Sequence, residues 1–398
     1  ATVGLPVGAR VAVAMSGGVD SSVVAGLMVE AGYEVVGLTA RLYDVDPVEA
    51  ASRRAGSCCA PEDARDARAV AETLGIRHYV LDERAAFAAD VVQPFLDAWR
   101  DGETPNPCVE CNRSLKFERL VEAARALGAA LLATGHYARL DTDDAGRPRL
   151  RRGLDAAKDQ AYFLYPLTPS VAPWLRFPLG AMDKATVRAH ALRLGLTVAT
   201  KAESMDICFV GAQHVRNWVE ARTDVPASSL VALDGTRLGK HGSLAGYTVG
   251  QRRGLGLPRD RSDGQPRYVV DKRADGTVVI GRREDLRVAG LQIGRWVAVT
   301  GALPGQGDEV TVQIRHRGRP VAARVSAVAT LAVGTDELSG NSGGGGGGGG
   351  GSECVVEVEI LGELHGAGRG QSAVLLDGDR VLGGGVISAV RAATKGGQ

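Results

Sequence analysis

The sequence predicts an α/β fold, a parallel sheet with helices on both faces, followed by a small central domain and a C-terminal β-barrel. Residues 1 to about 197 alternate short apolar runs with helical patterns, and this alternation is typical of a parallel sheet. After about residue 210, glycine-separated segments rich in β-branched residues follow. From Arg295 onward the chain is almost entirely strand-like between turns, which favours a small barrel.

The expected elements of the first part follow one another along the chain. Strands are predicted at 11–15, 34–38, 78–81 and 130–134, the first of them buried, and helices at 23–30, 61–74, 86–100 and 116–127. Gly75 and Gly128 mark the ends of two of these helices. Parallel sheets bind ligands at the carboxyl ends of their strands. The polar turn Ser16–Ser22, which follows the first strand, is therefore expected at the binding edge.

The rest of the chain is predicted to be β-rich. Strands are expected at 268–270 and 277–280 in the central part, and at 296–300, 309–315, 321–325, 355–361 and 373–377 in the barrel. These patterns divide the chain into domains at 1–205, 206–285 and 286–398. Glycine occupies every position of 343–351. Such a tract forms no packed element, which predicts a flexible loop inside the last domain.

Composition and charge are those of a soluble protein with two or three domains. The chain has 398 residues and a net charge of +1, so its overall charge gives no direct support to nucleic-acid binding. No apolar run approaches the about 18 residues of a membrane span, and the first residues do not resemble a secretory signal. We therefore expect a cytoplasmic location and no membrane partner. In that compartment the six cysteines favour redox, metal-binding or buried roles over structural disulfides.

The most informative stretch is Val11–Ser22, which predicts a strand, a tight turn and the start of a helix. The adjacent Gly17 and Gly18 permit positive φ and a close approach of the backbone to a ligand. Free N–H groups at the positive end of the helix favour a phosphate. The turn lacks the lysine of a Walker loop and the third glycine of a Rossmann fingerprint. It resembles the SGGxDS loop of the PP-loop ATP pyrophosphatases, which adenylate a substrate and release pyrophosphate.

Two cysteine-containing stretches are candidates for chemistry. Cys108 and Cys111 lie in the segment 104–117, where two prolines predict an extended loop. The pair is compatible with a redox couple, half of a metal site, or a catalytic thiol beside its neighbour. No second CxxC or HxxxH is present, which disfavours a closed structural zinc site. Cys208 stands between Ile207 and Phe209, so a buried apolar role and a reactive role both remain open.

Several motifs occur together in an order that resembles one family. They are 16–22, 106–117, 133–139, 158–164, 207–209 and 247–256, continued by 370–374 and 378–385. Together they closely resemble the tRNA-specific 2-thiouridylases, enzymes that place sulfur on the wobble uridine of certain tRNAs. The resemblance covers nearly the whole chain apart from about 326–354.

This resemblance implies a mechanism that uses ATP and Mg²⁺. The uracil C2 oxygen is a poor leaving group until ATP adenylates it, with Mg²⁺ screening the phosphate charge. A persulfide on Cys208, supplied by a sulfur-donor protein, then attacks C2, and Cys111 resolves it to leave a Cys111–Cys208 disulfide. Lys116 and Arg113 are candidates for lowering the pKa of a thiol. The implied ATP-binding residues are Ala14, Met15, Ser16, Gly17, Gly18, Val19, Asp20, Ser21, Ala40 and Gly135.

The same resemblance implies contacts with the anticodon arm of tRNA, whose target base must leave its stack to reach an active site. The residues implied for the target base or the tRNA are Asn106, Pro107, Cys108, His136, Lys158, Asp159, Gln160, Arg315, His316 and Gln371. Asp159 does not attract phosphate, so we expect it to orient Lys158 or to accept a hydrogen bond from a base edge or a hydroxyl of the tRNA.

One position departs from the family pattern and leaves the mechanism open. Many members carry aspartate where this chain has Cys108, so a carboxylate role there does not carry over. Cys108, Cys111 and Cys208 could instead hold an iron–sulfur cluster with one open iron. The alternatives from other classes are a PP-loop enzyme with a nitrogen nucleophile and a non-enzymatic RNA-binding module. A structural or lid role is expected for Cys58 and Cys59, and Cys354 stays unassigned.

Overall fold

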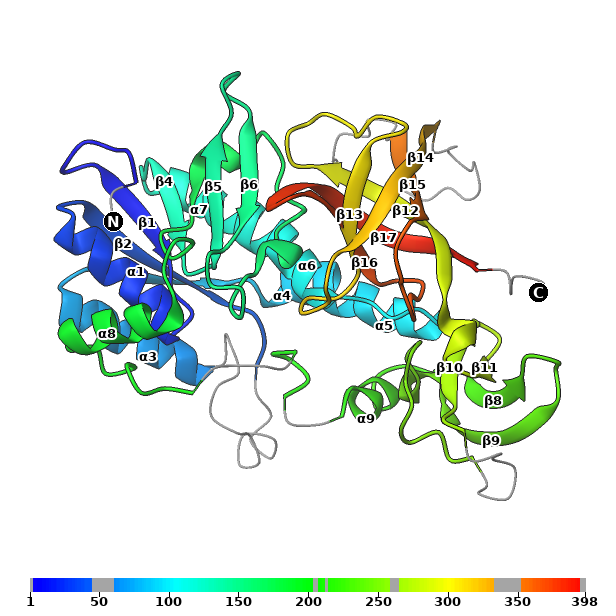
Figure 1. Cartoon of the computed structure of the whole chain (residues 1–398). Coiled ribbons are helices and arrows are strands. Elements are labelled where there is room, and N and C mark those ends of the chain that lie inside the picture. Colours follow the sequence, from blue (N-terminus) through cyan, green and yellow to red (C-terminus); the bar gives the residue numbers. More distant parts are fainter. Residues whose placement is uncertain are drawn as a thin grey trace, which may run out of the picture.

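In the computed structural model the described residues form three β-sheets (Figure 1). The structure describes residues 3–44, 61–202, 207–211, 214–257, 265–332 and 352–393. The predicted fold class, a parallel α/β sheet followed by a central unit and a C-terminal barrel, is confirmed. The glycine tract 343–351 and the pair Cys58–Cys59 lie outside the described residues. No helix within the described ranges is both long and apolar enough to cross a membrane.

The first sheet has five parallel strands in the order β3-β2-β1-β4-β7. They are β1 (Arg10–Ala14), β2 (Glu34–Arg41), β3 (Arg77–Asp82), β4 (Leu131–Thr134) and β7 (Leu175–Arg176). The first four agree with the predicted strands. The fifth was not predicted, because two residues are too few to show a strand period. The chain builds outward from β1 to β3 and then returns to place β4 on the other side of β1, so the strand order reverses there.

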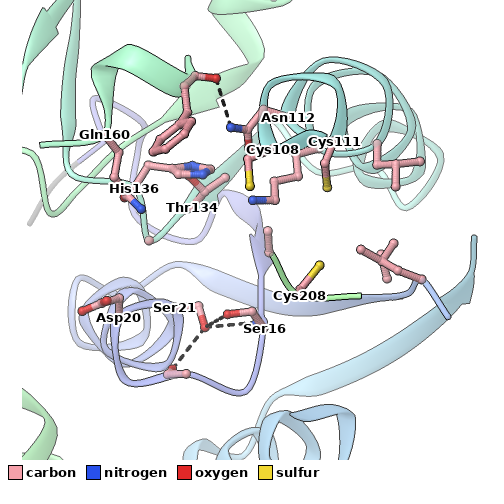
Figure 2. Close-up of a pocket in the computed structure, with 18 of the residues that line it drawn as sticks. Ser16, Asp20, Ser21, Cys108, Cys111, Asn112, Thr134, His136, Gln160 and Cys208 are labelled. Carbon is pink, nitrogen blue, oxygen red and sulfur yellow. Dashed lines mark hydrogen bonds between the residues drawn. The ribbon is translucent and has the colours of Figure 1, made fainter. Parts of the chain in front are cut away.

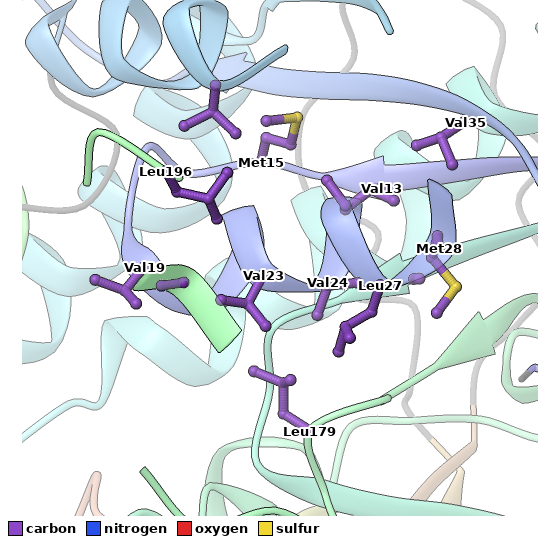
Figure 3. Close-up of a cluster of buried hydrophobic side chains, with 14 of the residues drawn as sticks. Val13, Met15, Val19, Val23, Val24, Leu27, Met28, Val35, Leu179 and Leu196 are labelled. Atoms are coloured by element: carbon purple, nitrogen blue, oxygen red, sulfur yellow. The ribbon is translucent and has the colours of Figure 1, made fainter. Parts of the chain in front are cut away.

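Helices cover both faces of this sheet, as predicted. On one face lie α1 (Val19–Glu30), α3 (Pro61–Leu74) and α8 (Lys184–Arg193). On the opposite face lies α7 (Leu120–Ala126). Figure 3 shows Val23 and Leu27 of α1 in one buried cluster with Val13 of β1. Because successive strand side chains point to opposite faces, Ala12 belongs instead to the cluster under α7.

Two longer helical runs carry the middle of the first part. One consists of α4 (Arg84–Phe87), η1 (Ala88–Val92) and α5 (Gln93–Arg100). The other consists of α6 (Pro107–Glu110) and the π-helical η2 (Cys111–Arg119), which continues into α7. The extended loop predicted for 104–117 is therefore wrong from Pro107 onward. Proline is favoured at the first position of a helix because its φ is already helical and its missing N–H is not needed there.

The C-terminal barrel consists of six strands closed by pairing of β12 with β17. They are β12 (Val288–Ala298), β13 (Glu309–Gln313), β14 (Val321–Ala332), β15 (Ser352–Ile360), β16 (Ser372–Asp377) and β17 (Arg380–Ala392). Closure leaves no unpaired edge among these strands. The sequence did not predict β17, because its glycines lower strand propensity. A Cβ at Gly383 would lie 2.3 Å from the Val297 carbonyl oxygen, so glycine is required for β12 and β17 to pair so closely.

A hairpin from the first half of the chain extends the barrel sheet. Its strands are β5 (Ala138–Thr142) and β6 (Pro148–Arg152), and β6 pairs with β17. Asp379 fastens the junction through ion pairs with Arg139 and Arg151. The hairpin, which follows β4 along the chain, is therefore joined to the barrel by backbone hydrogen bonds as well as by ion pairs.

The third sheet has four strands in the order β10-β11-β8-β9. It comprises β8 (Ala227–Ala232), β9 (Arg237–Ser243), β10 (Tyr268–Lys272) and β11 (Thr277–Gly281), preceded by the helix α9 (Val215–Glu220). Of the predicted domain boundaries, residue 205 lies outside the described residues and residue 285 lies between β11 and β12. The exact boundaries stay a prediction.

Lys272, at the end of β10, connects the third sheet to the first part of the chain. Its Nζ donates to the carbonyl oxygens of Glu103 at 2.9 Å and Tyr247 at 3.3 Å. It also lies 4.1 Å from the centroid of the Trp99 ring. Only 5% of the residue is exposed, and burial lowers the pKa of Lys272 to about 7. This contact holds the chain just before the helix that carries Cys108.

Stability is expected to depend on pH through Lys272. Between pH 7 and its ordinary value of 10.5 the unfolded chain binds this proton and the native protein does not, so native stability rises with pH. Relative to Lys272→Met, the free energy of unfolding of the native protein should rise by up to about 1.4 kcal/mol per pH unit. Urea unfolding at about pH 7 and about pH 9 measures this difference. The exposed neighbour variant Arg273→Met should follow the native profile. Identical profiles for the native protein and Lys272→Met would contradict the assignment.

Candidate active site

A cavity of about 700 Å³ lies at the carboxyl ends of β1, β2 and β4, where the strand order reverses. Figure 2 shows the 16–22 loop on one side of it and the helical segment 107–119 on the other. Among the predicted site residues, those that line it are Ala14, Met15, Ser16, Gly18, Asp20, Ser21, Ala40, Pro107, Cys108, Cys111, Gly135, His136, Lys158, Gln160, Cys208 and His316. Those that do not are Gly17, Val19, Asn106, Asp159, Arg315 and Gln371.

The 16–22 loop leaves the start of α1 open toward the cavity. Among the described residues no side chain caps the helix at Gly18, so its first N–H groups remain available to an anion. The Ser21 hydroxyl accepts from the Ser16 N–H at 3.1 Å and donates to the Gly18 carbonyl at 3.2 Å. Gly17 has φ +67°, and a Cβ there would lie 2.2 Å from the Asp63 carbonyl oxygen. Position 17 therefore requires glycine, because any side chain there would clash with the Asp63 backbone.

Asp20 is oriented by two residues that are distant in sequence. Its carboxylate accepts from Lys184 Nζ at 2.7 and 2.9 Å and from the Tyr137 hydroxyl at 2.8 Å. Lys184 begins α8, and Tyr137 follows β4. The ammonium group offsets the carboxylate charge beside the open helix end, which favours the approach of a phosphate. Sequence reasoning missed Lys184, because no local pattern connects it to the loop.

Lys201 makes a second cation–carboxylate contact next to the loop. Its Nζ donates to the Gly17 carbonyl at 3.1 Å and to Asp63 at 2.7 Å, and it also bonds Asp66. Burial works against its charge, but the hydrogen bonds to Asp63 and Asp66 outweigh burial and raise the pKa of Lys201. Lys201 and Asp63 both line the cavity. The sequence analysis named neither as a site residue.

The helical segment 107–119 presents two thiols and a cation to the cavity. Cys108 is exposed and Cys111 is half-buried, and Lys116 lines the same wall. Arg113, the other candidate for lowering the pKa of a thiol, does not line this cavity. Its Nε donates to Glu110 at 2.9 Å. Of the two predicted cations, Lys116 is the one that shares the cavity with the cysteines.

Cys208 reaches the cavity from the opposite wall (Figure 2). The Tyr43 hydroxyl donates to the Cys208 carbonyl at 2.9 Å. The neighbouring Phe209 packs edge-on against Phe87, with ring centroids 5.5 Å apart. Cys208 and Cys111 both pack against this buried aromatic cluster, and both are thiols in the structure. The fold thus brings the two predicted reactive cysteines to one space.

The three cavity cysteines are not arranged as metal ligands. Across the described residues, which include Cys108, Cys111 and Cys208, no group of three or more His, Cys, Asp or Glu could hold a metal ion. The side chains therefore do not fit the iron–sulfur alternative, and we derive no step through a cluster.

The turn after β4 approaches the 16–22 loop closely. A Cβ at Gly135 would lie 2.8 Å from the Ser21 backbone nitrogen, so glycine is needed there. His136 is 8% exposed, with Nδ1 2.7 Å from the Thr134 hydroxyl. Burial, with a smaller contribution from Lys116, holds the pKa of His136 well below its usual value. The imidazole is therefore neutral at physiological pH.

Residues 158–160 divide between the cavity and the support of their own segment. Lys158 lines the cavity. Asp159 is buried, and its carboxylate accepts from Arg152 Nε at 2.6 Å and from the Gly153 N–H at 2.9 Å. Gln160 lines the cavity while its Oε1 accepts from the Tyr137 N–H at 3.0 Å.

The barrel contributes to the same cavity through the loop after β13. His316 and Arg317 line it. Gln313 Nε2 shapes the loop by donating to the His316 carbonyl at 2.7 Å, and the His316 ring lies 4.5 Å from the Phe163 ring at an interplanar angle of 31°. The site is therefore built from both the parallel sheet and the barrel.

Besides Asp159, three predicted tRNA-contacting residues lie outside the cavity. Arg315 is exposed and donates to the Gly366 carbonyl at 2.6 Å. Gln371 Oε1 accepts from the Gly368 N–H at 2.8 Å. Asn106 lines a smaller cavity of about 330 Å³ on the other side of Pro107.

Comparison with known proteins gives consistent matches along the chain. Family models match residues 9–212, 216–282 and 352–387, with the descriptions "tRNA methyl transferase HUP domain", "tRNA methyl transferase PRC-barrel domain" and "Aminomethyltransferase beta-barrel domain". The tRNA-specific 2-thiouridylase MnmA of Caulobacter vibrioides is 42% identical, over 98% of this chain and 97% of its own. The protein of the same name from Methylorubrum extorquens is 45% identical, over 97% and 95%.

Proposed function

This chain is a member of the tRNA-specific 2-thiouridylase family, and we propose that it replaces the C2 oxygen of the wobble uridine of tRNA with sulfur in an ATP-dependent reaction. One observation carries the proposal: the open helix end at the 16–22 loop and the thiols of Cys111 and Cys208 face one cavity. A phosphate site and a thiol pair in one space suit adenylation followed by sulfur transfer.

The loop side of the cavity suits a triphosphate. The free N–H groups of α1 favour negative charge, and Lys184 and Lys201 offset the carboxylates beside the loop. Asp20 and Asp63, the carboxylates beside the loop, would coordinate Mg²⁺, because carboxylate oxygens are ligands that this ion prefers. When bound, Mg²⁺ screens the phosphate charges and helps pyrophosphate to leave.

The thiol side suits sulfur transfer. The uracil O2 attacks the α-phosphate of ATP and pyrophosphate leaves. The terminal sulfur of a Cys208 persulfide, loaded by a donor protein, then attacks C2, and AMP departs with the former O2. The Cys111 thiolate next attacks the Cys208 sulfur, which releases 2-thiouridine and forms a Cys111–Cys208 disulfide. An external reductant must reopen that disulfide before another cycle.

Nucleoside analysis tests the proposal directly. Incubation of the protein with tRNA, ATP, Mg²⁺ and a persulfide source should convert wobble uridine to 2-thiouridine, detected by mass spectrometry after digestion. Omission of ATP or of the persulfide source should stop conversion. Parallel incubations supply a methyl donor or ammonia in place of the persulfide source and should leave the base unmodified. A methylated or aminated base there would contradict sulfur transfer, and so these incubations test the methyl transfer that two family-model descriptions name and a nitrogen nucleophile.

We expect the anticodon arm to cover the cavity mouth at Arg317. This residue is exposed and lines the cavity, so its guanidinium can meet a phosphate of the arm. Arg317→Ala should weaken binding of an anticodon stem-loop and lower the slope of log K against log salt by about 0.7, measured by fluorescence anisotropy. The control Arg324→Ala removes an exposed charge at the opposite end of β13 and should leave the slope unchanged. Equal slopes for both variants would refute the contact.

A further inference from the structure

Asn112 is a buried polar residue in the wall that carries the thiols. It is 3% exposed and lines the cavity. It follows Cys108 by one helical turn and is adjacent to Cys111, and Figure 2 shows all three side by side on the helical segment. None of the catalytic steps described above uses Asn112.

The orientation of the Asn112 amide follows from its neighbour. Its Nδ2 donates to the Phe163 carbonyl at 3.1 Å, and because a carbonyl oxygen only accepts, the NH₂ group must face Phe163. The Phe163 ring in turn packs on His316 of the barrel. The amide is therefore held in one orientation by two parts of the fold, with its oxygen on the side away from Phe163.

That oxygen lacks a hydrogen bond within the protein. Across the described part of the chain, Asn112 Oδ1 is buried and has no hydrogen-bond partner. Buried acceptors are nearly always paired, so an orphan in a cavity wall indicates a ligand that donates to it. The missing group must carry an N–H or O–H and must reach the thiol side of the cavity.

We infer that Asn112 Oδ1 accepts a hydrogen bond from N3–H of the target uracil, and that it thereby selects uracil over cytosine. The inference rests on the proposed function. Uracil carries a hydrogen on N3 beside C2, the atom to be thiolated, whereas N3 of cytosine has a lone pair and no hydrogen. With cytosine, two acceptors would face each other and the buried oxygen would stay unpaired, which is costly.

The position of Asn112 agrees with this role. Cys108 precedes it and Lys116 follows it by one turn on the same wall, so a base held by Oδ1 lies beside the thiols. The ammonium group of Lys116 can then donate a hydrogen bond to one of the uracil carbonyl oxygens that flank N3. The 16–22 loop, which suits the phosphates, lies across the cavity (Figure 2).

Competition binding tests the inference without requiring turnover. Anticodon stem-loops with uridine, cytidine or 3-methyluridine at the target position compete with a labelled uridine stem-loop, in the presence of a non-hydrolysable ATP analogue. The native protein should prefer uridine over both other bases by about 10- to 100-fold. Asn112→Leu, which keeps the volume but removes the acceptor, should bind all three within about threefold. The 3-methyluridine arm needs no variant, because the methyl group removes the N3–H from the ligand.

A matched control separates recognition from helix damage. Ser114→Ala alters a buried polar residue of the same segment whose hydroxyl donates to the Glu110 carbonyl at 3.0 Å and which does not line the cavity. It should keep the native preference. If Asn112→Leu keeps the native preference for uridine over the other two bases, the inference is overturned. This holds also if the variant raises the KM for ATP, because Asn112 would then act on the nucleotide and not on the base. Failure of the native protein to form 2-thiouridine would instead overturn the proposed function, so the two failures are distinguishable.

Discussion

Cys208→Ser is expected to abolish 2-thiouridine formation, with a loss of about 10³-fold or more, while tRNA-dependent release of pyrophosphate continues for one turnover. The serine hydroxyl cannot carry a persulfide, but the 16–22 loop that binds ATP is untouched. Cys111→Ser should block sulfur release in the same way, because it removes the thiol that resolves the persulfide in the proposed mechanism. Single-turnover assays of pyrophosphate and of thiolated nucleoside, run in parallel, separate the two steps.

Cys354 provides the matched control for the cysteine variants. It lies in β15 of the barrel, is half-buried, and does not line the cavity. Cys354→Ala should therefore thiolate tRNA at the native rate. Normal thiolation by Cys208→Ser or Cys111→Ser would refute the persulfide and resolving roles of these two cysteines.

Gly17→Ala is expected to impair both folding of the loop and use of ATP. The alanine would need φ near +67° and would place its Cβ 2.2 Å from the Asp63 carbonyl oxygen, so the start of α3 must shift. Left-handed strain alone costs about 1–3 kcal/mol. The displaced loop should also lose most of the rise in melting temperature that ATP produces in the native protein. Thermal unfolding with and without ATP measures both effects.

Gly18→Ala adds the same methyl group at the next position and serves as the stability control. Gly18 has φ −92°, and its nearest neighbour would be the Ser16 hydroxyl at an ordinary 3.6 Å. Without ATP this variant should unfold within about 0.5 kcal/mol of the native protein. If Gly17→Ala melted like Gly18→Ala and kept the native response to ATP, the proposed role of the turn would be wrong.

Local patterns in the sequence determined the parallel sheet and the nucleotide-type loop. Short apolar runs indicate the strands β1, β2 and β4, because strands buried on both faces need continuous apolar residues. Paired glycines between such a strand and a helix predict the 16–22 turn. Both signals depend on a few consecutive residues, so they need no knowledge of the rest of the fold.

Only the tertiary structure decided which distant residues complete the site. Lys184 and Lys201 contact the loop because α8 and the chain after it pack on α1. His316 lines the same cavity as the thiols because the barrel docks against the 160–164 segment. The same packing buries Asn112 with its Nδ2 paired and its Oδ1 without a hydrogen-bond partner among the described residues. Contacts of this kind arise from packing between elements far apart in the chain, and no local period or spacing encodes them.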